Sequence, residues 1–182
     1  MELPEQPRGL LQLFAAGELE AFETLFRQFQ GDVYGWIVRI VRDPGTAEDL
    51  TIETFWRIHR AHARFDPQRG FGPWARRIAT NVALDYLKSA RAREKEWTEN
   101  RSTEFEQHSR SPDPAIRQEM RERTQRAFQQ LPASLQVVAT LALIEELPHS
   151  EIAEALNLTT PAVKSRLFRA VRRLRRKLGD LE

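Results

Sequence analysis

Apolar residues recur at spacings of three and four over most of the chain, which is the period of an amphipathic helix. The first long stripe follows Leu10 and comprises Phe22, Leu25, Phe26, Phe29, Val33, Trp36, Ile37 and Ile40. This stripe predicts a helix with one core-facing side, broken near Gly31. The run Asp43-Pro44-Gly45 then predicts a turn that ends the helix.

A second helix is expected from Thr46, which can cap it, with Asp49 at the third helical position. Apolar residues lie on two of its sides, one with Ala47, Leu50, Thr54 and Ile58 and another with Ile52, Phe55 and Trp56. A helix of this kind is either deeply buried or docks a partner. His59 and His62 lie one turn apart and could share a metal ion, but no third ligand is evident, so a solvated helix face is the default interpretation.

The segment from Phe65 to Pro73 predicts a loop, since it carries two Gly and two Pro. It also carries Phe65 and Phe71, with Trp74 at its exit, and the flanking cations are Arg64, Arg69, Arg76 and Arg77. Aromatic faces stack on unpaired bases and guanidinium groups bind phosphates, so the loop is a candidate for binding single-stranded nucleic acid. The alternative is that these aromatics only fill a helical core, and composition alone favours it.

Another helix is expected from Trp74 to Lys88, with Ala75, Ile78, Ala79 and Val82 on its inner side. Four polar residues, spaced by four, four and three, form one ridge on the other side: Arg77, Asn81, Asp85 and Lys88. An Asn among cations suits base edges, because its amide group both donates and accepts hydrogen bonds. A plain polar surface ridge explains the same pattern.

The apolar period is lost after residue 90, where charged and polar residues, Ser-Pro and Asp-Pro are typical of a linker. We therefore expect an all-α chain with two small helical domains, residues 1–93 and 116–182, joined by a flexible linker at residues 94–115. In the second domain, helices are predicted over Ala115–Gln130 and from Pro132 onward.

The end of the chain has the pattern of a helix-turn-helix. Ser150 is the expected cap of the first helix, and Ala153 is small enough for the two helices to approach each other. Asn157 lies at the tight turn, where it tolerates the left-handed conformation better than most residues do. Thr160 and Pro161 are expected to begin the last helix. Many short helix pairs share this spacing, so the basic last helix strengthens the DNA-binding interpretation.

Charge is distributed unevenly, although the formal net charge of the 182 residues is only +2. Eight Lys or Arg and no Asp or Glu lie between Thr160 and Leu178, which indicates a polyanionic partner. The chain has no Cys, which excludes disulfides and Cys-based zinc sites. We see no signal peptide and no apolar run near the ~20 residues that cross a bilayer, so a soluble, cytoplasmic protein is expected.

Two segments resemble the extracytoplasmic-function (ECF) group of bacterial RNA polymerase sigma factors. The first comprises AEDLTIETFWRIHRA and RFDPQRGFGPWARRIATNVALDYLKSARAR, and the second runs from LPASLQVV to AVKSRLFRAVRRLRRKL. The resemblance implies that the first domain binds the β′ clamp helices of core RNA polymerase and melts the promoter. Its implied polymerase-binding residues are Asp49, Leu50, Ile52, Glu53 and Phe55. Its implied minus-ten residues are Phe65, Phe71, Trp74, Arg77, Asn81, Asp85 and Lys88.

The resemblance also implies that the second domain reads the minus-thirty-five element through the major groove. The implied contacts are Thr160, Ala162, Lys164, Ser165, Arg166 and Arg169, whereas Arg172, Arg173 and Arg176 fit phosphate contacts or a merely solubilising role. The chain departs from the family at Ile52, where Gln is usual, and at Thr159–Ala162, where a Gly-Thr pair is common. A more apolar polymerase contact and an unusual minus-thirty-five sequence are therefore expected.

The partners implied by the resemblance are core RNA polymerase, through its β′ clamp helices and β flap, promoter DNA and, commonly in the family, an anti-sigma factor. No cofactor, metal or catalytic residue is predicted, because the sequence has no phosphate loop and its four His are scattered. A stand-alone helix-turn-helix regulator is the alternative function. It explains residues 132–178 but not the aromatic loop or the helix before it.

Overall fold

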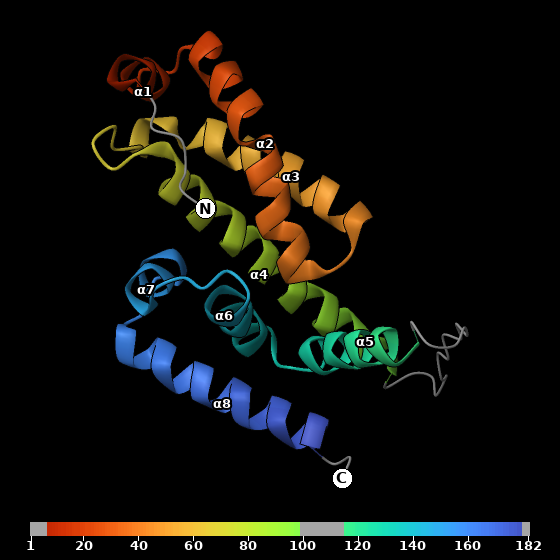
Figure 1. Cartoon of the computed structure of the whole chain (residues 1–182). Helices are drawn as coiled ribbons and strands as arrows, with labels where there is room; N and C mark the ends of the chain where they lie inside the picture. Colours follow the sequence, from red (N-terminus) through yellow and green to blue (C-terminus); the bar gives the residue numbers. More distant parts are fainter. Residues whose placement is uncertain (1–6, 99–114, 180–182) are drawn as a thin grey trace.

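The computed structural model describes residues 7–98 and 115–179, and every regular element in these ranges is helical (Figure 1). The first half contains α1 (Arg8–Ala15), α2 (Leu19–Val41), α3 (Pro44–Arg60), the 3-10 turn η1 (His62–Arg64) and α4 (Phe71–Thr98). The second half contains α5 (Ala115–Gln129), α6 (Ala133–Leu143), α7 (His149–Leu156) and α8 (Thr160–Gly179). The predicted all-α class with two helical units is confirmed. The predicted linker begins inside α4, and its residues 99–114 lie outside the described ranges.

Helices α2, α3 and α4 pack on one another and form the core of the first half. The predicted stripe of α2 is confirmed, since Leu25, Phe29 and Ile37 have no exposed surface. The break expected near Gly31 is wrong, because α2 continues through it. One helical Gly costs only about 1 kcal/mol, which the packing of the stripe outweighs. The chain turns earlier, at Gly17, whose φ of +92° favours glycine.

Helix α3 begins before the position that its sequence pattern predicted. Asp43 caps it by accepting a hydrogen bond from the amide of Thr46 over 2.7 Å, and Pro44 is the first helical residue. Thr46 therefore lies inside the helix, because Pro at the first position favours the earlier start. Hydrogen bonds from the hydroxyl and amide of Thr46 lower the pKa of the Asp43 carboxyl below its usual value.

The helix-turn-helix is present as α7, a short turn and α8. Asn157 has a φ of 53°, so the left-handed turn predicted there is confirmed. The expected caps are displaced: α7 begins at His149, after Pro148, so Ser150 lies inside it. The hydroxyl of Thr159, rather than Thr160, accepts a hydrogen bond from the amide of Ala162 over 3.3 Å. In both places a proline next to the boundary favours an earlier start of the helix, by two residues in α7 and by one residue in α8.

Helix α6 is buried on two sides. Leu135 and Ala139 belong to a small core between α5, α6 and α8, with Phe128, Leu131 and Leu174 among its other members. Val137, Val138 and Leu141 belong instead to the large core that also contains the buried residues of α2 and α4. One hydrophobic core therefore runs from the first half into the second, and Figure 1 shows α6 and α7 beside α4. No helix in the described ranges is long and apolar enough to cross a membrane.

Candidate nucleic-acid interface

The aromatic residues of the loop before α4 do not share one environment. Phe65 and Phe71 are buried, and their ring centroids lie 5.4 and 5.5 Å from that of Phe14 in α1. The alternative interpretation, that the aromatics fill a core, therefore describes these two rings in this structure. Trp74 is only partly buried and packs on Phe65 at 5.0 Å. Of the three candidates, Trp74 is the one with a face available to a base.

A hollow of about 760 Å³ opens beside Trp74. One wall of the hollow is formed by the aromatic loop and the start of α4, which contribute guanidinium groups. The other wall is formed by α7. The residues that line it include Arg64, Arg69, Arg76 and Arg77 from the first half and Glu151 and Glu154 from α7. An aromatic face among several cations suits an unpaired base with its neighbouring phosphates.

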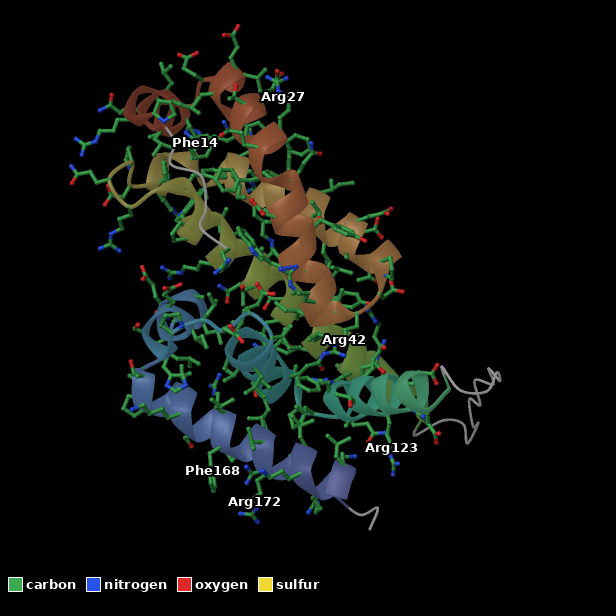
Figure 2. All side chains as sticks on the ribbon, viewed as in Figure 1. Phe14, Arg27, Arg42, Arg123, Phe168 and Arg172 are labelled. Carbon is green, nitrogen blue, oxygen red and sulfur yellow. The ribbon has the colours of Figure 1, made fainter. Side chains whose placement is uncertain are left out.

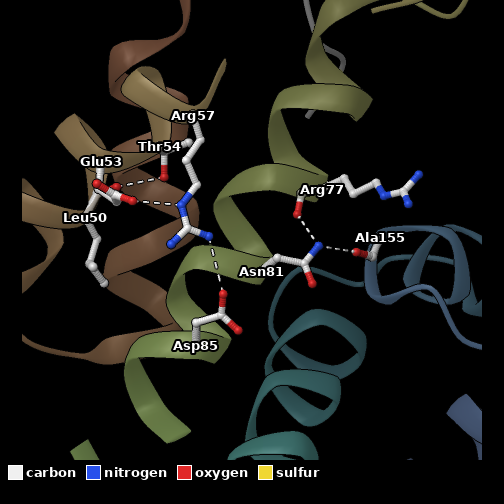
Figure 3. A network of polar contacts seen from close by, with 8 residues as sticks. All are labelled: Leu50, Glu53, Thr54, Arg57, Arg77, Asn81, Asp85 and Ala155. Carbon is white, nitrogen blue, oxygen red and sulfur yellow. Dashed lines mark hydrogen bonds and ion pairs between the residues drawn. The ribbon is translucent and has the colours of Figure 1, made fainter. Parts of the chain in front are cut away.

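The predicted polar ridge lies on α4, next to this hollow. Arg77, Asp85 and Lys88 are exposed, and Asn81 is half-buried because α7 packs on α4. The side-chain amide of Asn81 donates two hydrogen bonds, to the carbonyl of Arg77 over 2.8 Å and to that of Ala155 in α7 over 3.1 Å (Figure 3). The structure thus places the four ridge residues along one helix, as their spacing predicted.

Arg57 connects α3 with this ridge. Its guanidinium binds Glu53 on α3 at 2.7 Å and Asp85 on α4 at 3.3 Å (Figure 3). The hydrogen bond to Glu53, followed by the one to Asp85, raises the pKa of Arg57. Exposed pairs of this kind contribute little stability, so the contact mainly orients the three side chains. The sequence analysis missed Arg57, although its spacing of four from Glu53 is a recognisable helical ion-pair signal.

The outward side of α3 carries two large apolar side chains among charged ones. Ile52 is 70% exposed and Trp56 is 58% exposed, and Asp49 beside them is exposed as well. Leu50 and Glu53 are partly exposed. Ile52 and Trp56 are four residues apart, so the two exposed apolar side chains are neighbours on the surface of the helix. Trp56 was not among the predicted contacts, although its apolar side of the helix was noted.

Phe55 lies differently from the other predicted polymerase contacts. It is only 3% exposed, and its ring packs on those of Phe26 at 4.7 Å and Phe22 at 6.4 Å. In this structure it therefore holds α3 against α2 and does not face outward. The sequence pattern grouped Phe55 with Ile52 and Trp56, but in the structure its ring packs inward on α2 while those two side chains stay exposed.

The start of α8 carries the residues predicted to read duplex DNA. Lys164, Ser165 and Arg169 are exposed, while Thr160, Ala162 and Arg166 are partly exposed. The opposite side of the helix is anchored by the buried Val163, Ala170 and Leu174. Figure 2 shows Phe168 and Arg172 pointing away from the rest of the molecule. Phe168 is exposed and was not predicted as a contact.

His59 and His62, which could have shared a metal ion, each contact a different residue. The Nδ1 atom of His62 lies 3.3 Å from the carbonyl oxygen of Ala15, and the ring of His59 packs edge-on against Phe22. No group of three potential metal ligands occurs in the part of the chain that the structure describes. These contacts tie η1 and the end of α3 to α1 and α2.

Two family models match the chain, each on one of the two helical units. Residues 25–93 match sigma-70 region 2, and residues 121–174 match sigma-70 region 4. The RNA polymerase sigma-H factor of Pseudomonas aeruginosa is 32% identical over 174 residues, which cover 91% of this chain and 90% of that protein. The RNA polymerase sigma factor CarQ of Myxococcus xanthus is 31% identical and covers 94% of this chain and 97% of its own length.

Solved structures share the fold at low sequence identity. CnrH, solved in complex with the cytosolic domain of CnrY, has a TM-score of 0.64 at 24% identity and covers 96% of this chain and 98% of its own. The sigma factor RpoE of Bartonella quintana, solved with the anti-sigma factor NepR, has a TM-score of 0.61 at 17% identity. It covers 90% of this chain and 100% of its own.

Proposed function

The chain belongs to the extracytoplasmic-function group of RNA polymerase sigma factors. We propose that different surfaces of the chain bind the polymerase and the promoter. The protein binds core RNA polymerase, recognises the minus-ten and minus-thirty-five promoter elements and supports DNA melting. We assign polymerase binding and melting to residues 1–93, duplex recognition to residues 116–182, and the connection to residues 94–115. The protein contributes no catalytic chemistry of its own and acts in the cytoplasm, where the polymerase and DNA are.

The outward side of α3 is the proposed polymerase contact. Ile52 and Trp56 supply its apolar centre, and Asp49 and Glu53 supply charges at its edge. Interfaces of this kind gain most of their affinity from a few buried aromatic or apolar anchors surrounded by polar groups. The partner is the pair of β′ clamp helices, and a second contact joins the C-terminal unit to the β flap.

The hollow beside Trp74 and the ridge on α4 together are the proposed site for the non-template strand of the minus-ten element. The observation that carries this assignment is their adjacency: Trp74 and several guanidinium groups line the hollow, and the Asn81 amide bonds the carbonyls of two lining residues, Arg77 and Ala155. Extruding a base costs a few kcal/mol of unstacking, which a shaped aromatic pocket can return. Phe65 and Phe71 do not face the strand in this proposal; they hold the loop in place by packing on Phe14.

A stand-alone helix-turn-helix regulator is the competing function, since such a protein also needs a basic recognition helix. It accounts for residues 121–174 but leaves the region 2 match over residues 25–93 unexplained. Run-off transcription with purified core polymerase on genomic fragments separates the two. A sigma factor yields start-site-directed transcripts with core enzyme, whereas tight operator binding by an isolated dimer without polymerase would support the regulator.

We expect the Asn81→Ala variant to open promoters poorly while binding core polymerase like the wild type. Its amide is the group on the ridge that can both donate to and accept from a base edge, and a good bidentate base contact is worth about 1–3 kcal/mol. Permanganate reactivity of promoter thymines measures the opening, and co-elution with core enzyme measures binding. Thymine reactivity equal to that of the wild type would contradict the assignment.

We expect Arg166→Ala to weaken promoter binding and to change the base preference at one minus-thirty-five position. Arg166 lies in the second turn of α8, where side chains reach base edges in the major groove. Binding to a set of promoters with single-base changes tests it, with Arg176→Ala near the end of α8 as the matched control. A uniform loss on all sequences, with the salt slope lowered by about 0.9, would make Arg166 a phosphate contact instead.

A further inference from the structure

A second hollow, of about 440 Å³, opens between the start of α7 and the middle of α8. It is lined by His149, the first residue of α7, and by side chains of α8. The lining residues from α8 are Lys164, Leu167, Phe168, Val171, Arg172 and Arg175. Among the described residues that line this α7–α8 hollow none is acidic, and none is shared with the hollow beside Trp74. The α7–α8 hollow is therefore a separate site with its own chemistry.

The three fixed cations of the α7–α8 hollow lie on one side of α8. At 3.6 residues per turn, Lys164, Phe168, Arg172 and Arg175 fall within roughly 80° of one another around the helix axis. All four are exposed, and Figure 2 shows Phe168 and Arg172 pointing away from the rest of the molecule. In the part of the chain that the structure describes, none of the three cations pairs with a carboxylate. Their charge is therefore available to an anion from outside.

His149 joins these cations from the other helix of the helix-turn-helix. It is partly exposed and follows Pro148, where α7 begins. The turn at Asn157 folds α7 back on α8, so the start of α7 comes to lie beside the middle of α8. In a helix-turn-helix the second helix enters the major groove while the first helix crosses the DNA backbone. His149 therefore lies where a backbone phosphate comes close when α8 is in the groove.

The acidic residues near the start of α7 lie outside the α7–α8 hollow. Glu145, in the loop before α7, binds Arg39 on α2, and Glu146 is exposed. Helix α6, which also packs on α7, carries no charged residue. The charged groups between α7 and α4 line the hollow beside Trp74 instead: Arg76, Arg77, Glu151 and Glu154. Inside the α7–α8 hollow, the imidazole of His149 therefore has only cations as charged neighbours, and an anion there would favour its protonated form.

The floor of the α7–α8 hollow is apolar. Leu167 and Val171 are partly buried, and Phe168 offers an open ring that is 68% exposed. Protein contacts to the DNA backbone involve both the phosphate oxygens and the sugar rings between them. Cations around an apolar floor fit a phosphate together with its deoxyribose better than they fit a small inorganic anion.

We propose that the α7–α8 hollow binds a backbone phosphate at the minus-thirty-five element, and that His149 takes up a proton when the phosphate binds. Arg172 and Arg175 supply fixed positive charge beside the phosphate, and the imidazolium donates a hydrogen bond to it. This inference rests on the proposed role of α8 in reading duplex DNA. It adds a contact from α7 and a dependence of promoter affinity on pH, neither of which that role requires.

Proton uptake gives promoter affinity a defined direction with pH. Histidine is the side chain that ordinarily changes its charge between about pH 5 and 8. Because a phosphate beside the ring stabilises the charged form, the complex binds more protons than the free protein does in this range. Affinity is therefore highest at acidic pH and falls as the pH rises toward about 8, where the ring is neutral in both states.

Three versions of the full-length protein test the contact: the unsubstituted chain, His149→Gln, which is neutral at every pH, and His149→Lys, which stays charged. Each is assembled with core polymerase, and binding to a promoter mapped by run-off transcription is measured between pH 6 and 8.5. The affinity of the unsubstituted protein relative to His149→Gln should be about five-fold higher at pH 6 and nearly equal at pH 8.5. His149→Lys should keep its advantage over His149→Gln throughout. His59→Gln, the same substitution on α3, should reproduce the unsubstituted pH profile.

Neutral phosphates identify the group that His149 contacts. In a set of promoter duplexes, one phosphate at a time around the minus-thirty-five element is replaced by an uncharged methylphosphonate. At pH 6 one replacement should weaken binding of the unsubstituted protein and of His149→Lys, and should leave His149→Gln nearly unchanged. The salt slope at pH 6 should also be steeper by about 0.9 for the unsubstituted protein than for His149→Gln, because one more phosphate is neutralised.

The outcomes separate this inference from the proposed function. An affinity ratio between the unsubstituted protein and His149→Gln that stays constant with pH would overturn the proposal, because His149 would then only support the start of α7. Thermal unfolding of the three proteins measures such a structural role directly. A ratio that changes with pH without any sensitive phosphate would overturn the backbone contact. Loss of promoter binding and transcription in every version, the unsubstituted protein included, would instead count against the proposed function and would remove the inference with it.

Discussion

Phe14→Ala is expected to lower the free energy of unfolding by about 3–5 kcal/mol, the range for removing a large buried aromatic side chain. Phe14 is 1% exposed and belongs to α1. Its ring contacts those of Phe65 and Phe71 in the loop and of Trp74 at the start of α4. Urea denaturation measures the loss. Promoter opening should fall with it, because the loop that bears Trp74 loses the ring on which it packs.

The adjacent residue gives a matched control. Leu13→Ala also shortens a large apolar side chain to alanine, but at a position that is more than half exposed. Exposed substitutions of this kind usually change stability by less than about 0.5 kcal/mol. If Phe14→Ala were no more destabilising than Leu13→Ala, the ring cluster would not be what holds the loop.

Ile52→Asp is expected to weaken binding to core polymerase by about 30-fold or more, while the free protein stays as stable as the wild type. An anchor residue at the centre of an interface contributes about 2 kcal/mol or more, which corresponds to that factor. Ile52 is largely exposed, so a charge there should leave the free energy of unfolding almost unchanged. Titration of labelled core enzyme measures the affinity, and thermal unfolding measures the stability.

Leu19→Asp makes the same kind of change at another exposed apolar residue, the first one of α2. It should bind core polymerase like the wild type. Equal losses in the two variants would indicate a general effect of added negative charge and would remove the assignment of α3 as the docking helix.

The helical architecture could be predicted because local signals agree with the tertiary structure. The stripe of α2 is buried as its period predicted, and Asn157 turns the chain between α7 and α8. Helix starts were less predictable. Asp43 caps α3 in place of Thr46, and Thr159 caps α8 in place of Thr160. In each case two possible capping residues lie close together, and the position of the nearby proline favours the earlier one.

The candidate sites were predicted as sets of residues, but their environments were not. The pattern of Phe65 and Phe71 allowed base-stacking or core rings, and composition alone favoured a core. The deciding contact is Phe14, on a helix that precedes the residues matching sigma-70 region 2. Likewise, the spacing of Asn81 placed it on a ridge but could not show that Ala155 would take its amide. Contacts between residues distant in sequence decide both cases, and no local pattern encodes them.

The two-sided burial of α6 has a consequence for how the protein is made. Domains fold as units, starting from the N-terminal one while the ribosome is still adding residues. When α6 emerges, α2 and the start of α4 have already formed the surface that covers its second side. As the chain grows, α6 therefore meets a finished apolar surface, and its second side is covered before α7 and α8 are complete.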